Sequence, residues 1–301
     1  MDATRPQSPA TLAVWWLAIR PKTLGAAVAP VLMGLAIAWG EGRWHGGAAA
    51  AALAGALLLQ IAANFANDYF DWKKGADDER RVGPVRVVAA GLVRPAAMRV
   101  AIVLTLLAVV PIAAYLVWRG GPAFIAIGVA SILFAVLYTG GPRPLAYVGL
   151  GDVAAFAFFG PIAVAGTHAA VTTEFAWLPA VAGIGPGCLA MTLLAVNNLR
   201  DRVGDARVNK RTLAVRFGAR FARAEILLSI LAAAVVPIGL ALAEGRWFAI
   251  AASLTCLTMI PALRAVFAGG EGHTLNRVLA STGRLIILYG FAFAIGWIIA
   301  W

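Results

Sequence analysis

The sequence predicts an all-α integral membrane protein with about nine transmembrane helices in one bundle. Hydrophobic residues make up 61% of the 301 residues and charged residues only 13%, whereas soluble domains carry about 25% charged residues. The mean hydropathy of +0.84 is also typical of a chain that lies largely in lipid. Several apolar runs reach the length of about 20 residues that a helix needs to cross a bilayer. These observations exclude an ordinary soluble globular protein.

Tight turns and polar stretches separate the apolar runs and define each expected helix in order. A polar stretch at residues 40–46 ends the first run and precedes the second. Short turns at residues 119–122 and 244–246 contain Gly, so each divides one long apolar stretch into two helices. Longer polar segments separate the other runs. The nine expected spans are residues 23–39, 47–66, 99–117, 122–138, 147–167, 177–197, 224–243, 246–263 and 284–301.

The distribution of basic residues predicts the orientation of the bundle. If the N-terminus is cytoplasmic and nine helices cross, 22 of the 25 Lys and Arg residues fall in cytoplasmic segments. Only Arg43, Arg119 and Arg246 then fall on the outer side. This asymmetry is the positive-inside pattern of membrane proteins. We therefore expect the N-terminus inside and the C-terminus outside.

The chain is expected to form one membrane domain over residues 1–301. Asn64 precedes Asp68 by four residues and Asn197 precedes Asp201 by four, each at the end of an even-numbered span. This shared spacing suggests pseudo-repeat halves. They are roughly residues 12–138 and 139–263, followed by a final helix at 284–301. The net charge of +11 fits anionic lipid headgroups and a phosphorylated substrate, and needs no nucleic-acid partner.

Two acid-rich segments follow directly on apolar runs: NFANDYFDWKKGADD at residues 64–78 and NNLRDRVGD at residues 197–205. Carboxylates at the end of a membrane span are energetically costly, which makes them candidates for a functional site. Asp68 and Asp71, like Asp201 and Asp205, are spaced to face one side of a helix. Oxygen ligands without His or Cys favour Mg²⁺, which completes its shell with water and phosphate oxygens. The simpler alternative is that these acids only balance nearby basic side chains in solvated loops.

Basic and aromatic residues near these segments are candidates for binding a diphosphate. They are Lys22, Arg86, Arg143 and Arg216, together with Tyr138 and Tyr147. Arg143 lies in the stiff loop LYTGGPRPLAYVGLGD, which could present its guanidinium to a phosphate. The alternative is that these basic residues are ordinary anchors at the membrane interface.

These segments resemble the UbiA-type intramembrane aromatic prenyltransferases, and the resemblance extends over most of the chain. NDYFDWKKGAD resembles the first Asp-rich motif of that family, and NNLRDRVGD resembles the second. RPKTL, PRPLAYVGLGD and NNLRDRVGDARVNKRTLAVRFG are most similar to the members that act on 1,4-dihydroxy-2-naphthoate. The resemblance implies a nine-helix bundle with a central cavity open to the cytoplasmic side, in the cytoplasmic (inner) membrane of a bacterium.

The resemblance also implies a reaction in menaquinone biosynthesis. Mg²⁺-dependent transfer moves a polyprenyl group from an allylic polyprenyl diphosphate to 1,4-dihydroxy-2-naphthoate, with loss of CO₂, giving demethylmenaquinone. The implied metal ligands are Asp68, Asp71, Asp77, Asp201 and Asp205, with Asp78 as an alternative to Asp77. The implied catalytic residues are Asp68, Asp71, Asp201, Asp205, Arg143 and Lys22. The implied substrate-binding residues are Asn64, Asn67, Asn197, Asn198, Tyr138, Tyr147, Arg86 and Arg216.

Other functions stay open at this point. A related enzyme would prenylate another aromatic acceptor, such as 4-hydroxybenzoate or homogentisate. A membrane transporter or lipid-binding protein is a more distant alternative, because transporters usually place their charges near the bilayer midplane. The sequence leaves open the donor chain length, the oligomeric state and the group that deprotonates the acceptor.

Overall fold

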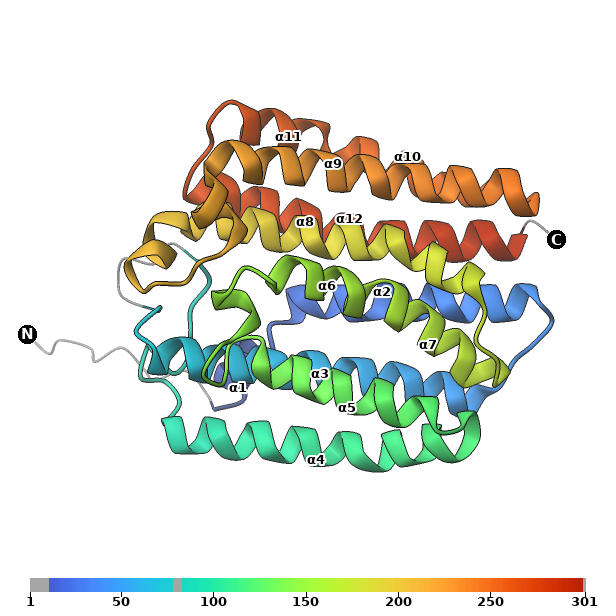
Figure 1. Cartoon of the computed structure of the whole chain (residues 1–301), viewed down its shortest axis with the longest axis horizontal. Helices are drawn as coiled ribbons and strands as arrows, with labels where there is room; N and C mark the ends of the chain where they lie inside the picture. The colour runs from blue at the N-terminus through green and yellow to red at the C-terminus, as the bar shows by residue number, and fades with distance from the viewer. Residues whose placement is uncertain (1–10, 78–82, 300–301) are drawn as a thin grey trace, which may run out of the picture.

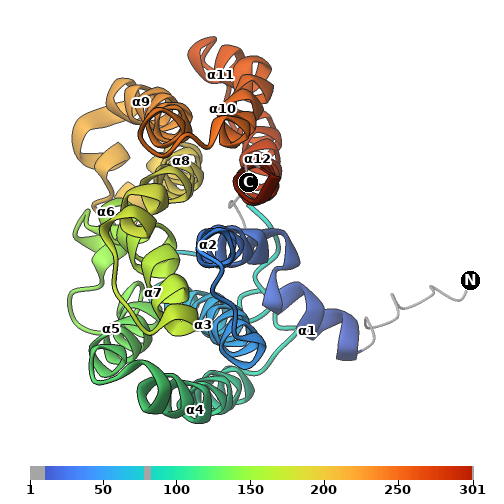
Figure 2. The same ribbon diagram turned by 90° about the vertical axis from the view of Figure 1, so that its right-hand side faces the viewer.

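The computed structural model describes residues 11–77 and 83–299, and every regular element in these ranges is a helix. The long helices run side by side in one bundle (Figure 1). Two of them, α2 (Pro21–Gly40) and α8 (Trp177–Arg207), are the most buried of the helices long enough to cross a membrane. In each, 67% of the residues in an apolar stretch of 18 are buried. Both lie inside the bundle when it is viewed along the helices (Figure 2). The all-α prediction is therefore confirmed.

Within the described ranges, eight helical segments are long and apolar enough to cross a membrane. They are α2, α3 (Gly46–Lys73), α4 (Pro95–Gly120), α6–α7 (Gly151–Thr172), α8, α9 (Leu213–Glu244), η2–α11 (Trp247–Phe267) and α12 (His273–Ile299). The span expected at residues 122–138 corresponds to α5 (Ala123–Leu137), which is apolar but has only 15 residues. A helix of this length is about 22 Å long, which is shorter than the hydrocarbon core of about 30 Å.

Several helices extend beyond the boundaries predicted from apolar runs. The last helix begins at His273 instead of residue 284. Likewise, α8 continues to Arg207 and α9 begins at Leu213, so only five residues connect them. A short helix, α1 (Thr11–Ile19), precedes α2 and ends at Arg20 in a left-handed conformation with φ 56°. Hydropathy shows where a helix can lie in lipid, whereas backbone hydrogen bonds decide where the helix ends.

The span expected at residues 147–167 is divided at Gly160 into α6 (Gly151–Phe159) and α7 (Pro161–Thr172). A Cβ atom at Gly160 would lie 2.5 Å from the carbonyl oxygen of Gly183 on α8. One at Gly187 would lie 2.6 Å from the carbonyl oxygen of Phe156. Only glycine permits backbones to approach so closely. The break therefore holds α6 and α7 directly against α8.

The helices alternate in direction, so several connections gather at one end of the bundle, on the left of Figure 1. They follow α3, α5, α8 and α11 (Ile260–Phe267) in the chain. The connection after α5 includes the short 3₁₀ helix η1 (Leu145–Tyr147). Both acid-rich segments of the sequence lie at this end. The fold thus brings together segments that are far apart in the sequence.

An apolar cavity lies between α2, α3, α4, α5 and α6–α7. Small residues open its walls, among them Gly55 on α3, Gly128 on α5 and Gly166 on α7. The rings of Phe134 and Phe158 also line it, stacked with centroids 4.4 Å apart. The lining on α3 extends to Ala63, one helical turn before the first acid-rich segment reaches Asn67. The cavity therefore points towards the acid residues.

Candidate active site

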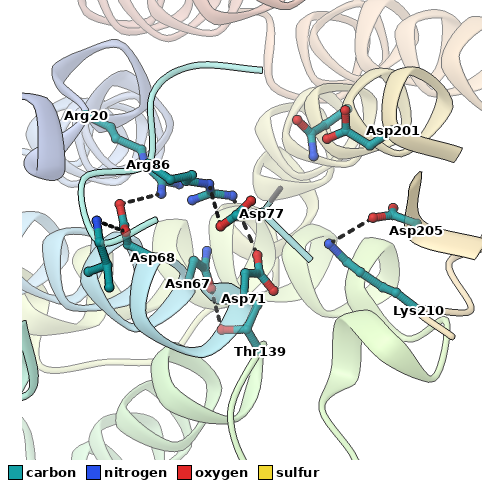
Figure 3. A network of polar contacts seen from close by, with 12 residues as sticks. Arg20, Asn67, Asp68, Asp71, Asp77, Arg86, Thr139, Asp201, Asp205 and Lys210 are labelled. Carbon is teal, nitrogen blue, oxygen red and sulfur yellow. Dashed lines mark hydrogen bonds and ion pairs between the residues drawn. The ribbon is translucent and has the colours of Figure 1, made fainter. Parts of the chain in front are cut away.

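The first acid cluster begins on the last two turns of α3, where Asp68 is fully buried. Its two carboxylate oxygens accept hydrogen bonds from the backbone N–H groups of Val88 at 3.0 Å and Val87 at 3.1 Å. The Arg20 guanidinium lies 3.6 Å from Oδ2 (Figure 3). Asp68 therefore anchors the turn after residue 86 to α3, in addition to the metal-ligand role predicted for it.

Asp71 and Asp77 share one arginine (Figure 3). Arg86 places Nη2 3.6 Å from Oδ2 of Asp71 and Nε 3.4 Å from Oδ2 of Asp77. The Tyr147 hydroxyl donates a hydrogen bond to Oδ1 of Asp71 at 3.1 Å. Nε and Nη1 of Arg86 are buried without a hydrogen-bond partner. The other acid considered at this position, Asp78, lies outside the described residues.

The second acid cluster lies on the last turns of α8 and contains Asp201 and Asp205. Arg200 donates to both carboxylate oxygens of Asp201, at 2.7 and 2.6 Å, and to Oδ1 of Asn197 at 2.7 Å. Lys210 lies 3.5 Å from Oδ1 of Asp205. Oδ2 of Asp205 is buried without a hydrogen-bond partner. One carboxylate is therefore firmly paired, whereas the other keeps an unused acceptor.

The loop after α5 joins the two clusters through Tyr147. Its ring lies under two lysine ammonium groups, with its centroid 4.3 Å from Nζ of Lys74 and 5.6 Å from Nζ of Lys210. Its carbonyl oxygen accepts a hydrogen bond from the backbone N–H of Arg211 at 3.1 Å. Figure 3 shows Lys210 reaching from the α8–α9 connection towards the space between Asp71 and Asp205. The two acid clusters thus face a common space.

The charges in this space fix the protonation of two residues. Burial alone would lower the pKa of Lys210, but the surrounding carboxylates, Asp71 first among them, outweigh burial and raise this pKa. Burial, followed by the negative charge of Asp71, raises the pKa of the Tyr147 phenol. Lys210 therefore stays positively charged, and Tyr147 stays a neutral hydrogen-bond donor.

Two predicted substrate-binding residues make contacts that tie structural elements together. Asn64 donates to the carbonyl oxygen of Ile19 at 2.8 Å and to Oγ1 of Thr23 at 3.0 Å, so it joins α3 to the α1–α2 junction. Asn198 donates to both carboxylate oxygens of Asp152, at 3.0 and 3.3 Å. It therefore joins α8 to α6.

The remaining predicted residues divide between the site and its surface. Arg216 donates to the carbonyl oxygens of Val148 and Arg211, so it holds the loop after η1. Oδ1 of Asn67 accepts from Thr139 Oγ1 at 2.9 Å in the site (Figure 3). Lys22 and Arg143 are exposed, and Tyr138 is partly buried at the end of α5.

Three residues of the site were missed from the sequence: Lys74, Arg200 and Lys210. Lys210 lies within the segment NNLRDRVGDARVNK and caps the end of α8, donating its backbone N–H to the carbonyl oxygen of Asp205 at 2.8 Å. Lys74 follows directly on α3 and donates to the carbonyl oxygen of Thr139 at 2.6 Å. Both lie beside the acids in the sequence, and this adjacency was the available signal.

The donor chemistry of the two clusters fits a hard divalent cation such as Mg²⁺. All the candidate ligands are carboxylate or amide oxygens, and Oδ2 of Asp205 is a buried acceptor with an unused lone pair. Among the described residues, no three His, Cys, Asp or Glu side chains are grouped closely enough to enclose a metal alone. This agrees with an ion that takes one or two carboxylates and fills its shell with phosphate oxygens and water.

Comparisons with known proteins agree with the fold. The UbiA prenyltransferase family profile matches residues 27–279. The 1,4-dihydroxy-2-naphthoate octaprenyltransferase of Mycobacterium tuberculosis (strain ATCC 25618 / H37Rv) is 36% identical over 95% of this chain and 97% of its own length. The protein of the same name from Haemophilus influenzae is 33% identical over 96% of both chains.

Solved structures share the fold at low sequence identity. A UbiA homologue from Aeropyrum pernix K1, without ligand, aligns with a TM-score of 0.69 and 15% identity over 93% of this chain and 97% of that chain. A UbiA homologue from Archaeoglobus fulgidus bound to DMAPP and Mg²⁺ aligns with a TM-score of 0.62 and 15% identity over 93% and 99%. From the profile match and the relatives above 30% identity, the chain belongs to the UbiA prenyltransferase family.

Proposed function

We propose that this chain transfers a polyprenyl group from an allylic polyprenyl diphosphate to 1,4-dihydroxy-2-naphthoate in menaquinone biosynthesis. The C–O bond of the donor breaks, the diphosphate leaves, and the electron-rich ring attacks the allylic carbon. The ring carboxylate leaves as CO₂, and the direct product is the hydroquinone demethylmenaquinol, which is oxidised to demethylmenaquinone after it leaves the enzyme. The acceptor follows from the relatives named for the same substrate. The observation that carries the proposal is the pair of acid clusters facing one space at the end of an apolar cavity.

Mg²⁺ would be held mainly by Asp71, Asp77, Asp201 and Asp205, with Asn67 and Asn197 nearby. When bound, the ion would offset the diphosphate charge and act as a Lewis acid on the leaving oxygen. Asp68 already accepts two backbone hydrogen bonds. Asp68 would therefore have two roles: it would bind the metal, and it anchors the turn that carries Arg86.

Basic side chains would stabilise the negative charge that develops on the leaving diphosphate. Lys210 is the best placed, because it is buried, charged and directed between the clusters. Arg86 carries two buried N–H groups that lack acceptors, and phosphate oxygens would supply them. The exposed Arg143 and Lys22 would act at the entrance, where the charged end of the donor arrives.

The isoprenoid chain of the donor would lie in the apolar cavity along α3. Gly55, Gly128 and Gly166 keep the cavity open for a long chain. The stacked rings of Phe134 and Phe158 lie among its lining residues and would exclude water from an allylic cation and stabilise it. The cavity and the acid clusters would then bind the two ends of one molecule.

The enzyme would lie in the cytoplasmic (inner) membrane of a bacterium, with the acid clusters on the cytoplasmic side. This orientation follows from the excess of Lys and Arg at that end. Nine spans would be reached if α5 crosses together with its flanking residues, despite its 15-residue length. The N-terminus would then be inside and the C-terminus outside.

Product analysis tests the proposal. The purified protein in detergent is incubated with octaprenyl diphosphate, Mg²⁺ and either 1,4-dihydroxy-2-naphthoate or 4-hydroxybenzoate. We expect demethylmenaquinol, or the quinone that it forms in air, identified by mass only with the naphthoate, and no product after EDTA treatment. Product with 4-hydroxybenzoate alone would assign a different acceptor, and full activity of D71N and D201N would overturn the assignment of the metal site.

A further inference from the structure

Arg86 occupies the space between two carboxylates that are proposed above to hold the metal. Its guanidinium lies within 3.6 Å of Asp71 and 3.4 Å of Asp77. We infer that Arg86 is an exchangeable counter-ion. It neutralises these two acids in the substrate-free enzyme and passes to the diphosphate of the donor when Mg²⁺ takes the carboxylates. Mg²⁺ and the diphosphate therefore bind as a coupled pair; this inference rests on the proposed function.

The contacts of Arg86 are loose compared with those of the arginine in the other cluster. Charge-assisted hydrogen bonds of this kind are usually 2.7–2.9 Å long, and both Arg86 contacts are longer. Its Nε and Nη1 make no hydrogen bond, although its side chain is only 11% exposed. Arg200, by contrast, makes bonds of 2.6–2.8 Å to Asp201, Asn197 and Asn276 and is fully buried. Arg200 is therefore held in one position by its hydrogen bonds, whereas Arg86 keeps N–H donors that make no hydrogen bond.

The backbone around Arg86 is held firmly, so an exchange of partners requires only side-chain rotation. The N–H groups of the next two residues, Val87 and Val88, are bonded to Asp68. The carbonyl oxygen of Arg86 itself accepts from the N–H of Ala90 at 2.9 Å. Arginine has several rotatable bonds, and its planar fork matches two phosphate oxygens. The anchored turn therefore acts as a fixed base from which the guanidinium can reach either partner.

Charge explains why the two ligands would bind together. A divalent cation on Asp71 and Asp77 would repel the guanidinium that shares those oxygens. Metal alone would leave Arg86 as a buried charge without a partner, which is strongly unfavourable. The diphosphate removes this cost because it brings acceptors for Arg86 together with further ligands for the metal. By thermodynamic linkage, each ligand then raises the affinity of the other by the same factor.

Metal binding without substrate tests this inference. The full-length protein in detergent is titrated with Mn²⁺ alone, and the free ion is measured by electron paramagnetic resonance; Mn²⁺ prefers the same oxygen ligands as Mg²⁺. We expect R86Q to bind Mn²⁺ about tenfold more tightly than the unchanged protein, within the ~5–150-fold range typical of coupled sites. R86M is a second neutral variant. R86K keeps the charge and should bind as weakly as the unchanged protein.

R94Q is the matched control, because Arg94 is exposed at the start of α4 in the same connection and carries the same charge. R94Q should bind Mn²⁺ like the unchanged protein. Equal or weaker binding by R86Q and R86M, or an equal gain in R94Q, would overturn the inference. D71N separates this failure from that of the proposed function. If D71N loses both Mn²⁺ binding and prenyl transfer while R86Q binds normally, only the counter-ion role fails. If D71N keeps both, the proposed metal site fails as well.

Discussion

The hydroxyl of Tyr147 donates a 3.1 Å hydrogen bond to Oδ1 of Asp71, linking the loop after α5 to the first acid cluster. The two residues are 76 positions apart in the sequence. The same tyrosine accepts a backbone hydrogen bond from Arg211 beside the second cluster. One side chain and its backbone thus set the spacing of the two groups of acids.

Replacing Tyr147 by Phe removes this link without changing the shape of the ring. A hydrogen bond to a charged group contributes about 1.5–3 kcal/mol, so we expect kcat/KM for the donor to fall about tenfold or more. Steady-state kinetics with varied donor measure the effect. Y115F makes the same change on α4, where the Tyr115 hydroxyl lies near Gly47, and should keep full activity. Unchanged kinetics in Y147F would remove Tyr147 from the site.

Lys210 is expected to stabilise the leaving diphosphate, so K210Q should lower kcat/KM about 100-fold, as the loss of a preorganised donor does in other enzymes. Inhibition by inorganic pyrophosphate should weaken at the same time. R211Q removes a charge from the adjacent exposed residue and should behave like the unchanged protein. If K210Q only lowers thermal stability, and neither kcat/KM nor the inhibition constant for pyrophosphate changes, Lys210 merely neutralises Asp205.

The apolar cavity is expected to hold the isoprenoid chain, and G128L places a large side chain in its wall. A Cβ atom at Gly128 has no neighbour closer than 3.8 Å, so the helix tolerates the change. We expect kcat/KM for octaprenyl diphosphate to fall about tenfold, since overfilling a packed site typically costs ~1–3 kcal/mol. Dimethylallyl diphosphate should be affected much less.

G239L provides the control for the cavity, because Gly239 is exposed on α9, with nothing within 4 Å of its Cβ position. Both substitutions raise the helix propensity equally. An equal loss for long and short donors in G128L, or an equal loss in G239L, would place the chain elsewhere.

Asn64 is expected to stabilise the fold without touching the donor. N64A removes the hydrogen bonds to Ile19 and Thr23 at the α1–α2 junction, and the partly buried carbonyl oxygen of Ile19 loses this donor. We expect the free energy of unfolding to fall by about 1–3 kcal/mol, seen as a lower melting temperature in detergent, with KM for the donor unchanged. A raised KM with an unchanged melting temperature would instead support the substrate-binding role predicted from the sequence.

The sequence predicted the acids of the site better than the neighbours of those acids. Asp71 and Asp205 are recognisable because carboxylates at the end of an apolar run are rare and costly. Their partners depend on how distant loops close, and no local pattern reports that Tyr147 and Lys210 meet. Asn64 and Asn197 share the same spacing to a following Asp, but the two side chains have different surroundings. One faces the α1–α2 junction and the other faces Arg200.

Helix ends were predicted poorly for a related reason. The apolar run ends at residue 197, whereas α8 continues to Arg207, so hydropathy alone placed the end of this helix too early. The charged residues after position 197 lie outside the apolar run but are still part of the helix. The structure places Asp201 and Asp205 on the last turns of α8, in agreement with their helical spacing in the sequence.

The backbone contact at Gly160, Gly183 and Gly187 acts at a distance from the chemistry. Gly187 lies 14 residues before Asp201 on α8, which is about 21 Å along a helix. A small tilt of α8 at this contact would produce a larger displacement at the end of the helix that carries Asp201. The distance between the two acid clusters would then change. Replacing one of these glycines by Ala would therefore lower the rate of prenyl transfer, although every residue of the site is unchanged.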